Sequence, residues 1–225
     1  MIKMDLQFLG SRGASGGDGE SLGTSSGENI NIISTTDVWS YRHNPNNEPY
    51  VDAINTAVRG ISDDFPGLMN DVNTVDAAVL GGADRTQTLG FYGGGQVAIN
   101  ANYTNVDKMN RTYDAAVASG FHPGRGDKSG TEAVTYHEMG HALTDSIKTK
   151  MGKKDLDAVS KQIVDDAYKA TKGKGGTKAW AGAISGYAQK NYAECVAEAV
   201  CDWYCNGNKA KSESKAIMTQ LKKYA

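Results

Sequence analysis

Cysteine and net charge are both scarce in this sequence, and each shortage excludes a class of protein. Its three cysteines, at positions 195, 201 and 205, are odd in number and crowded together, which is not the pattern of a disulfide framework. The net charge of −2 predicts no strong attraction to nucleic acid or to an anionic membrane surface. No apolar run is long enough to cross a bilayer.

The N-terminus also lacks the continuous apolar stretch and the small-residue cleavage site of a secretory signal. Reduced thiols fit a cytosol better than an oxidising compartment, so we predict a cytoplasmic protein. Cys201 and Cys205 are four residues apart and would suit a metal ion. We favour small buried side chains instead, because no second pair of cysteines or histidines is nearby to complete such a site.

The chain has 225 residues, enough for one domain with its own core. Residues 10–27 are nearly all Gly, Ser, Asp, Glu and Thr, and seven of them are glycine. Such a stretch buries too little apolar surface to offset the entropy lost on ordering. We therefore predict a flexible segment over residues 1–28 and a folded domain over residues 29–225.

The apolar pattern predicts an α+β fold. Short strands are indicated at 78–80, 88–92 and 96–101, the last two joined by a glycine turn. Helical spacing predicts helices at 50–61, 64–72, 113–120, 131–150, 154–170, 192–205 and 212–224. The expected architecture is a small mixed or antiparallel sheet packed on the 131–150 helix, followed by the 192–205 helix.

The clearest motif is His137-Glu138-Met139-Gly140-His141, which has the pattern H-E-x-x-H. Residues four apart lie on one face of a helix, so both imidazoles can reach one zinc ion. Glu138 points to the flank of that face, where it can take a proton from a metal-bound water without being a ligand. This arrangement predicts a zinc hydrolase.

So short a pattern also occurs by chance in solvated helices. Here it contains two of the chain's four histidines, and Leu143 and Ile147 continue an apolar stripe, which predicts a packed helix. Ser129 or Thr131 would cap its start. Gly140 inside a helix costs roughly 1 kcal/mol relative to alanine, a cost that close packing against a neighbouring element would explain.

A catalytic zinc ion usually has three protein ligands. Candidates for the third are Glu194, Glu198 and Asp202, on a predicted helix that is apolar nearly all round and therefore buried. Buried carboxylates need a partner, which a metal ion and its histidines would supply. The alternative is a pair of surface glutamates matched with lysines, which the apolar surroundings disfavour.

With Tyr187 and Glu194-x-x-Ala197-Glu198 added, residues 129–203 resemble the gluzincin metallopeptidases, most closely the lethal-factor-like zinc proteases. The resemblance implies a zincin-like fold, with Glu194 as the third zinc ligand and Glu198 as a supporting residue. It also implies that Tyr187, seven residues before Glu194, stabilises the transition-state oxyanion. Tyr192 lies closer to Glu194 in sequence and competes for that role.

A second resemblance is shorter. Residues 4–10, Met-Asp-Leu-Gln-Phe-Leu-Gly, with the Gly/Ser stretch that follows, are similar to segments of tailed-phage head proteins, including Mu-type minor head proteins. This implies a phage or prophage origin, a place in the bacterial host cytosol or in the virion, and phage head proteins as partners.

Three functions remain open at this point. The first is a zinc metalloendopeptidase whose substrate is a peptide or protein, with residues 96–101 as a sheet edge to which an extended peptide adds as a strand. The second is a phage structural or morphogenesis protein whose zinc ion only stabilises the fold, with His122 or a cysteine as fourth ligand. The third is an effector or toxin that uses the peptidase chemistry on a host target.

Overall fold

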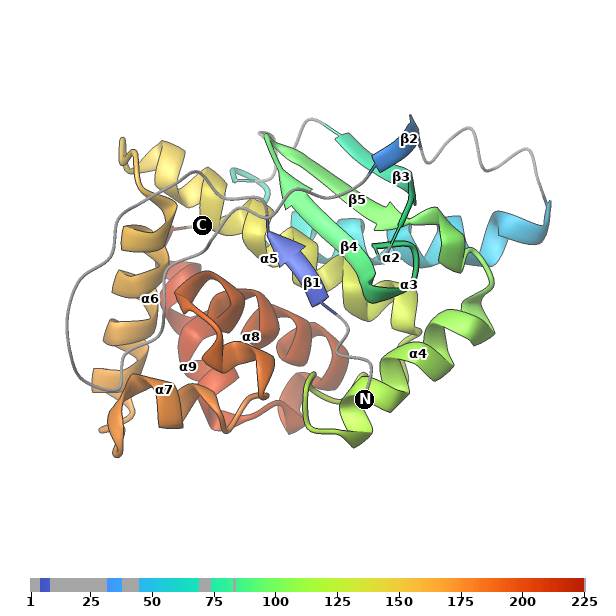
Figure 1. Cartoon of the computed structure of the whole chain (residues 1–225). Helices are drawn as coiled ribbons and strands as arrows, with labels where there is room; N and C mark the ends of the chain where they lie inside the picture. The colour runs from blue at the N-terminus through green and yellow to red at the C-terminus, as the bar shows by residue number, and fades with distance from the viewer. Residues whose placement is uncertain (1–4, 9–31, 38–44, 69–73, 83, 225) are drawn as a thin grey trace.

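The structure is a computed structural model that describes residues 5–8, 32–37, 45–68, 74–82 and 84–224. Its architecture is α+β, as predicted, and helices predominate (Figure 1). Most of the segment predicted to be flexible, residues 10–27, lies outside the described residues. The domain boundary near residue 28 therefore stays a prediction.

One mixed sheet contains the five described strands in the order β1-β4-β5-β3-β2. The central hairpin was predicted, and it joins β4 to β5 in antiparallel register. Gly94 and Gly95 form its turn with φ of 61° and 80°, a conformation that glycine adopts without steric cost. The strands are β1 (Asp5–Phe8), β2 (Ile32–Asp37), β3 (Thr74–Leu80), β4 (Thr88–Gly93) and β5 (Gln96–Asn100).

The sheet differs from the prediction at its edges. β5 lies between β4 and β3, so the expectation that residues 96–101 form an edge is wrong. Val97, Ala98 and Ile99 are all fully buried, as in a strand covered on both faces. The described edges are β1 and β2, for which the sequence predicted no strands. β1 falls inside the segment predicted to be flexible, and it pairs in parallel with β4.

Seven of the described helices position the site and its surroundings. The seven are α2 (Glu48–Asp64), α4 (Val106–Ala118), α5 (Gly130–Lys150), α6 (Leu156–Ala170), α7 (Gly176–Ala181), α8 (Tyr192–Asn206) and α9 (Ser212–Leu221). All but α7 were predicted, although α4 begins earlier than expected because the Asn105 side chain accepts a hydrogen bond from the Lys108 N–H.

Two of the described helices were not predicted. One is α7, and the other is α3 (Asp84–Gln87), a single turn before β4. The predicted helix 64–72 is wrong over its described part, because α2 ends at Asp64 and residues 66–68 form a turn. In the described part of the chain, no helix combines the length and the apolar character that a bilayer crossing requires.

Helix α5 runs through the middle of the molecule, between the sheet and the pair α8–α9 (Figure 1). Ser129 is its N-cap and forms a capping box with Glu132, which decides between the two caps that we considered. A Cβ atom on Gly140 would lie 2.9 Å from the Cα of Ala197, so only glycine lets α5 and α8 approach this closely. The close packing expected at Gly140 is confirmed.

Candidate metal centre

Helix α5 places His137 and His141 one turn apart, facing the same point. The two Nε2 atoms lie 3.2 Å from each other. Both side chains are buried, with exposed fractions of 0% and 1%. Burying two imidazoles against each other is unfavourable unless their polar atoms share a partner.

That partner comes from the first turn of α8. Asn191 caps this helix by accepting a hydrogen bond from the Glu194 N–H at 2.7 Å, which holds Glu194 in the first turn. The Oε2 atom of Glu194 lies 3.1 Å from His137 Nε2 and 3.2 Å from His141 Nε2. The two helices therefore bring three donor atoms together, although their residues are more than fifty positions apart.

The triangle of donor atoms has the right size for one metal ion. Tetrahedral ligands at zinc–nitrogen or zinc–oxygen distances of 2.0–2.2 Å stand about 3.3–3.6 Å apart, close to the separations found here. Among the described residues, His137, His141 and Glu194 make up a group whose ligand atoms are close enough together to hold a metal ion. The three residues predicted as ligands thus lie together.

Glu138 is buried beside this group. Its side chain has no exposed surface, and neither carboxylate oxygen has a hydrogen-bond partner within the described residues. Strand β4 packs tightly over it, since a Cβ atom on Gly90 would lie 3.0 Å from the Glu138 Cγ. An unpaired buried carboxylate is costly, and its persistence next to three donor atoms indicates a chemical role.

The charges of the centre are unbalanced. Burial raises the pKa of Glu138 well above its ordinary value, and the charges of Glu194 and Glu198 add to this against the opposing effect of His137. Burial lowers the pKa of His141. Burial also lowers the pKa of His137, but hydrogen bonds to Glu194 and Glu198 outweigh it and raise that pKa to about 10. A divalent cation would supply the missing positive charge.

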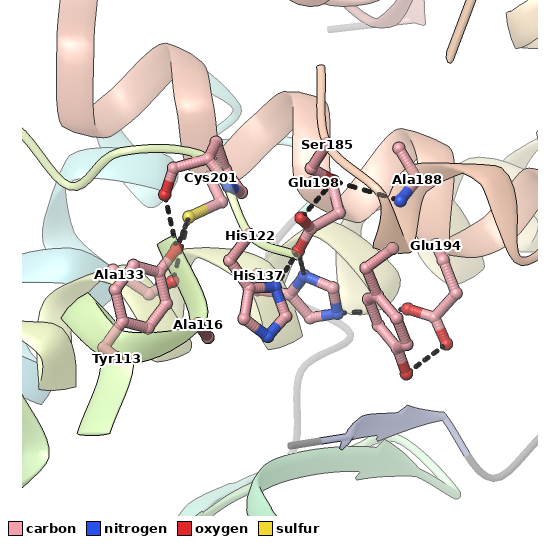
Figure 2. Close-up of polar contacts among 12 residues, drawn as sticks. Tyr113, Ala116, His122, Ala133, His137, Ser185, Ala188, Glu194, Glu198 and Cys201 are labelled. Carbon is pink, nitrogen blue, oxygen red and sulfur yellow. Dashed lines mark hydrogen bonds and ion pairs between the residues drawn. The ribbon is translucent and has the colours of Figure 1, made fainter. Parts of the chain in front are cut away.

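Glu198 is the centre of a second set of contacts, one turn further along α8 (Figure 2). Its Oε1 atom lies 2.8 Å from His137 Nδ1 and 3.0 Å from His122 Nδ1. Its Oε2 atom accepts a hydrogen bond from Ser185 Oγ at 2.6 Å. Burial raises the pKa of Glu198, but His122 and His137 outweigh burial and lower it to about 2.

Because an ionised carboxylate only accepts hydrogen bonds, the Nδ1 atom of His137 carries a hydrogen. The Nε2 atom of the ring is then the one available to a metal ion, and it is the atom that faces Glu194. The supporting role predicted for Glu198 therefore has a geometric basis.

Tyr187 also lies at the centre. Its hydroxyl donates to Glu194 Oε1 at 3.2 Å and accepts from Lys190 Nζ at 3.2 Å. Tyr192, the competing tyrosine, instead has Lys161 of α6 over its ring at 5.3 Å. Of the two tyrosines, Tyr187 is the one that the structure places against a ligand of the candidate metal.

The remaining candidates lie elsewhere. The Asp202 carboxylate accepts from the Lys211 N–H at 2.7 Å and from the Asn206 amide at 2.9 Å, so it joins α8 to the segment before α9. Cys201 Sγ donates to the backbone oxygen of Ala133, and all three cysteines are buried and free, in line with the apolar interpretation.

Sequence reasoning missed two site residues, Ser185 and Lys190, and considered a third, His122, only as a fourth zinc ligand. In the structure the Nδ1 atom of His122 contacts Glu198. Ser185 and Lys190 flank Tyr187 closely in sequence, which is the one signal that could have drawn attention to them.

The chain is thus an α+β protein with a buried two-histidine, one-glutamate group that could hold a metal ion. Comparisons of the chain with protein-family models, with curated proteins and with solved structures give no match. The resemblances to gluzincins and to phage head proteins therefore stay predictions.

Proposed function

We propose that this chain is a zinc-dependent metallopeptidase with a zincin-like fold. The observation that carries the proposal is the fully buried carboxylate of Glu138, which has no hydrogen-bond partner among the described residues and lies beside the His137, His141 and Glu194 triangle. Two imidazoles and one carboxylate are the ligand set of a catalytic zinc ion with an open position. A zinc ion held there would act as a Lewis acid that polarises a carbonyl and lowers the pKa of water.

The chain's own residues divide the chemistry of peptide hydrolysis. Glu138 takes a proton from the attacking water, whose oxygen bonds to the scissile carbonyl carbon. The same carboxyl then passes that proton to the nitrogen of the leaving amine as the C–N bond breaks. The place of Glu138, next to His137 in sequence and buried beside the donor triangle, suits a group that must both accept and return a proton.

Tyr187 is assigned the role of stabilising the oxyanion that forms on the scissile carbonyl. Its hydroxyl donates to the Glu194 Oε1 atom in this structure, one carboxylate away from the donor triangle. Moving that hydrogen bond from Glu194 to a developing oxyanion would stabilise the tetrahedral intermediate. Lys190 approaches the same hydroxyl and adds a positive charge near it.

A structural zinc site is the second candidate function, as in a phage head or morphogenesis protein. A closed site needs a fourth protein ligand. Within the described part of the chain the group has three members, His122 binds Glu198, and Cys201 contacts the backbone of Ala133. These contacts favour the catalytic interpretation. The effector hypothesis uses the same catalytic residues, and the phage origin rests on the resemblance of residues 4–10 and the Gly/Ser stretch that follows them.

The proposal is tested with the zinc-loaded full chain, a diverse peptide library and a set of phage head proteins. Cleavage products are sought by mass spectrometry, beside an identically purified Glu138→Gln variant. We expect cleavage by the native chain and a large loss in the variant. Zinc-loaded native protein that cleaves nothing, or a variant that cleaves equally well, would contradict a peptidase that depends on Glu138.

A further inference from the structure

Two loops carry polar side chains to Glu198 from outside the helices that hold the candidate metal ligands. His122 lies between α4 and α5, and Ser185 lies between α7 and α8. The side chains of His122 and Glu198 are completely shielded from solvent, and Ser185 is 5% exposed. Neither His122 nor Ser185 belongs to the motifs that led to the proposed function.

We propose that His122 and Ser185 are positioning residues that fix the carboxylate of Glu198, and through it the ring of His137. The inference rests on the proposed function, because it concerns the same metal centre. A carboxylate with one hydrogen-bond partner can turn about its own axis. Here Ser185 holds Oε2 while His122 and His137 share Oε1, so turning would break contacts at both oxygens (Figure 2).

Ser185 is itself held in place. Its Oγ atom accepts a hydrogen bond from the backbone N–H of Ala188 at 3.0 Å. The hydroxyl hydrogen is then directed to Glu198 Oε2, at the short distance of 2.6 Å typical of a bond to a charged carboxylate. The orientation of the Ser185 hydroxyl is therefore set by the backbone of its own loop.

The ring of His122 is fixed by its neighbours. It stacks on Tyr113 with a centroid distance of 5.4 Å and an angle of 9°, and the rings of Phe121 and Tyr187 meet it at 69° and 73°. Three aromatic contacts leave little room for the imidazole to rotate. Its Nδ1 atom therefore stays directed at Glu198.

The backbones of the two loops are also joined. The Gly186 N–H donates to the Gly120 oxygen at 2.8 Å, and the Tyr187 N–H donates to the Phe121 oxygen at 3.0 Å. These bonds lie next to Ser185 and His122 in sequence. The two loops thus form one unit that presents both positioning residues to Glu198.

The test measures zinc affinity of the full chain by competition with a chelator. Ser185→Ala and His122→Leu should each weaken zinc binding by roughly 10- to 100-fold, the usual effect of losing an outer-shell contact. His122→Asn should recover much of the loss, because its amide nitrogen stands near the place of Nδ1. Ser214→Ala is the matched control, since Ser214 is also buried but its hydroxyl has no partner in the described structure. It should bind zinc normally.

A double-mutant cycle shows whether the residues act through Glu198. In a Glu198→Ala background, Ser185→Ala should cause no further loss of zinc affinity. A full additional loss, or an unchanged affinity of Ser185→Ala in the native background, would overturn the inference. The melting temperature of each metal-free variant identifies those that fail to fold, and Ser185→Ala, the smaller change, then decides the matter.

The outcomes separate this inference from the proposed function. If zinc binds through His137 but its affinity is unchanged in the Ser185 and His122 variants, the positioning role is wrong and the proposed peptidase function is unaffected. Zinc binding that follows the expected pattern in a chain without peptidase activity supports the positioning role and removes the peptidase. A native chain that binds no zinc overturns both.

Discussion

The Nδ1 atom of His137 lies 2.8 Å from Glu198 Oε1, while its Nε2 atom lies 3.1 Å from Glu194 Oε2. One imidazole therefore joins two carboxylates that stand one turn apart on the same helix. The first contact orients the ring, and the second places its other nitrogen in the candidate ligand triangle. The site thus depends on the registration of α5 against α8.

Removing the orienting carboxylate tests this relationship. Glu198→Ala should weaken zinc affinity by roughly 10- to 100-fold, because His137 loses the group that fixes its tautomer and ring orientation. The measurement is a competition titration with a chelator. An unchanged dissociation constant would show that the contact between Glu198 and His137 has no part in metal binding.

Removing a ligand should have a larger effect. Elemental analysis of purified His137→Ala and Glu194→Ala variants should show that the zinc is lost, because two of three ligands cannot hold it firmly. Asp202→Ala is the matched control for the glutamate, since it removes a carboxylate from the same helix that contacts Lys211 and Asn206 instead. Full zinc content in the His137→Ala protein would rule out the proposed site.

The contact between α5 and α8 at Gly140 offers a further test. Alanine there gains roughly 1 kcal/mol of helix propensity, but its Cβ would lie 2.9 Å from the Ala197 Cα, a backbone atom that cannot move alone. We expect the clash to win, with a net loss of about 1–3 kcal/mol in the free energy of unfolding and weaker zinc binding. Chemical denaturation measures the free energy of unfolding, and competition with a chelator measures the zinc binding.

Gly124→Ala is the control for that substitution, since a Cβ atom there would meet nothing within 4 Å. If Gly140→Ala proved as stable as the native chain and bound zinc as tightly, the two helices would not need their close approach.

The sequence predicted those parts of the site that depend on local spacing. His137 and His141 share a face because helices repeat every 3.6 residues, and Glu194 was expected to be buried because its helix is apolar on nearly every side. His122 could not be placed, because it reaches Glu198 across 76 positions through loops that follow no periodicity. The position of β5 inside the sheet also depends on its parallel pairing with β3, a long-range contact that alternation along one strand does not reveal.

Glu138 should matter for turnover and little for metal binding. The substitution Glu138→Gln keeps the size of the side chain but removes its ability to take a proton, so turnover should fall by a factor of roughly 10² or more. Zinc content and the melting temperature should stay near native values, since the carboxylate has no partner to lose among the described residues. Native turnover in the variant would mean that another group activates the water.

Tyr187→Phe separates two roles of one hydroxyl. If the hydroxyl stabilises the oxyanion, its removal should lower kcat by roughly 10²–10³ and leave the zinc affinity nearly unchanged. If it serves only to hold Glu194 Oε1, from which it lies 3.2 Å, the zinc affinity should fall and kcat at saturating zinc should not. We expect the first result. Tyr192→Phe is the control and should be nearly silent, because the Tyr192 ring lies under Lys161 of α6. A variant with native kcat at full zinc occupancy would remove Tyr187 from the chemistry and leave it as a support for the third ligand.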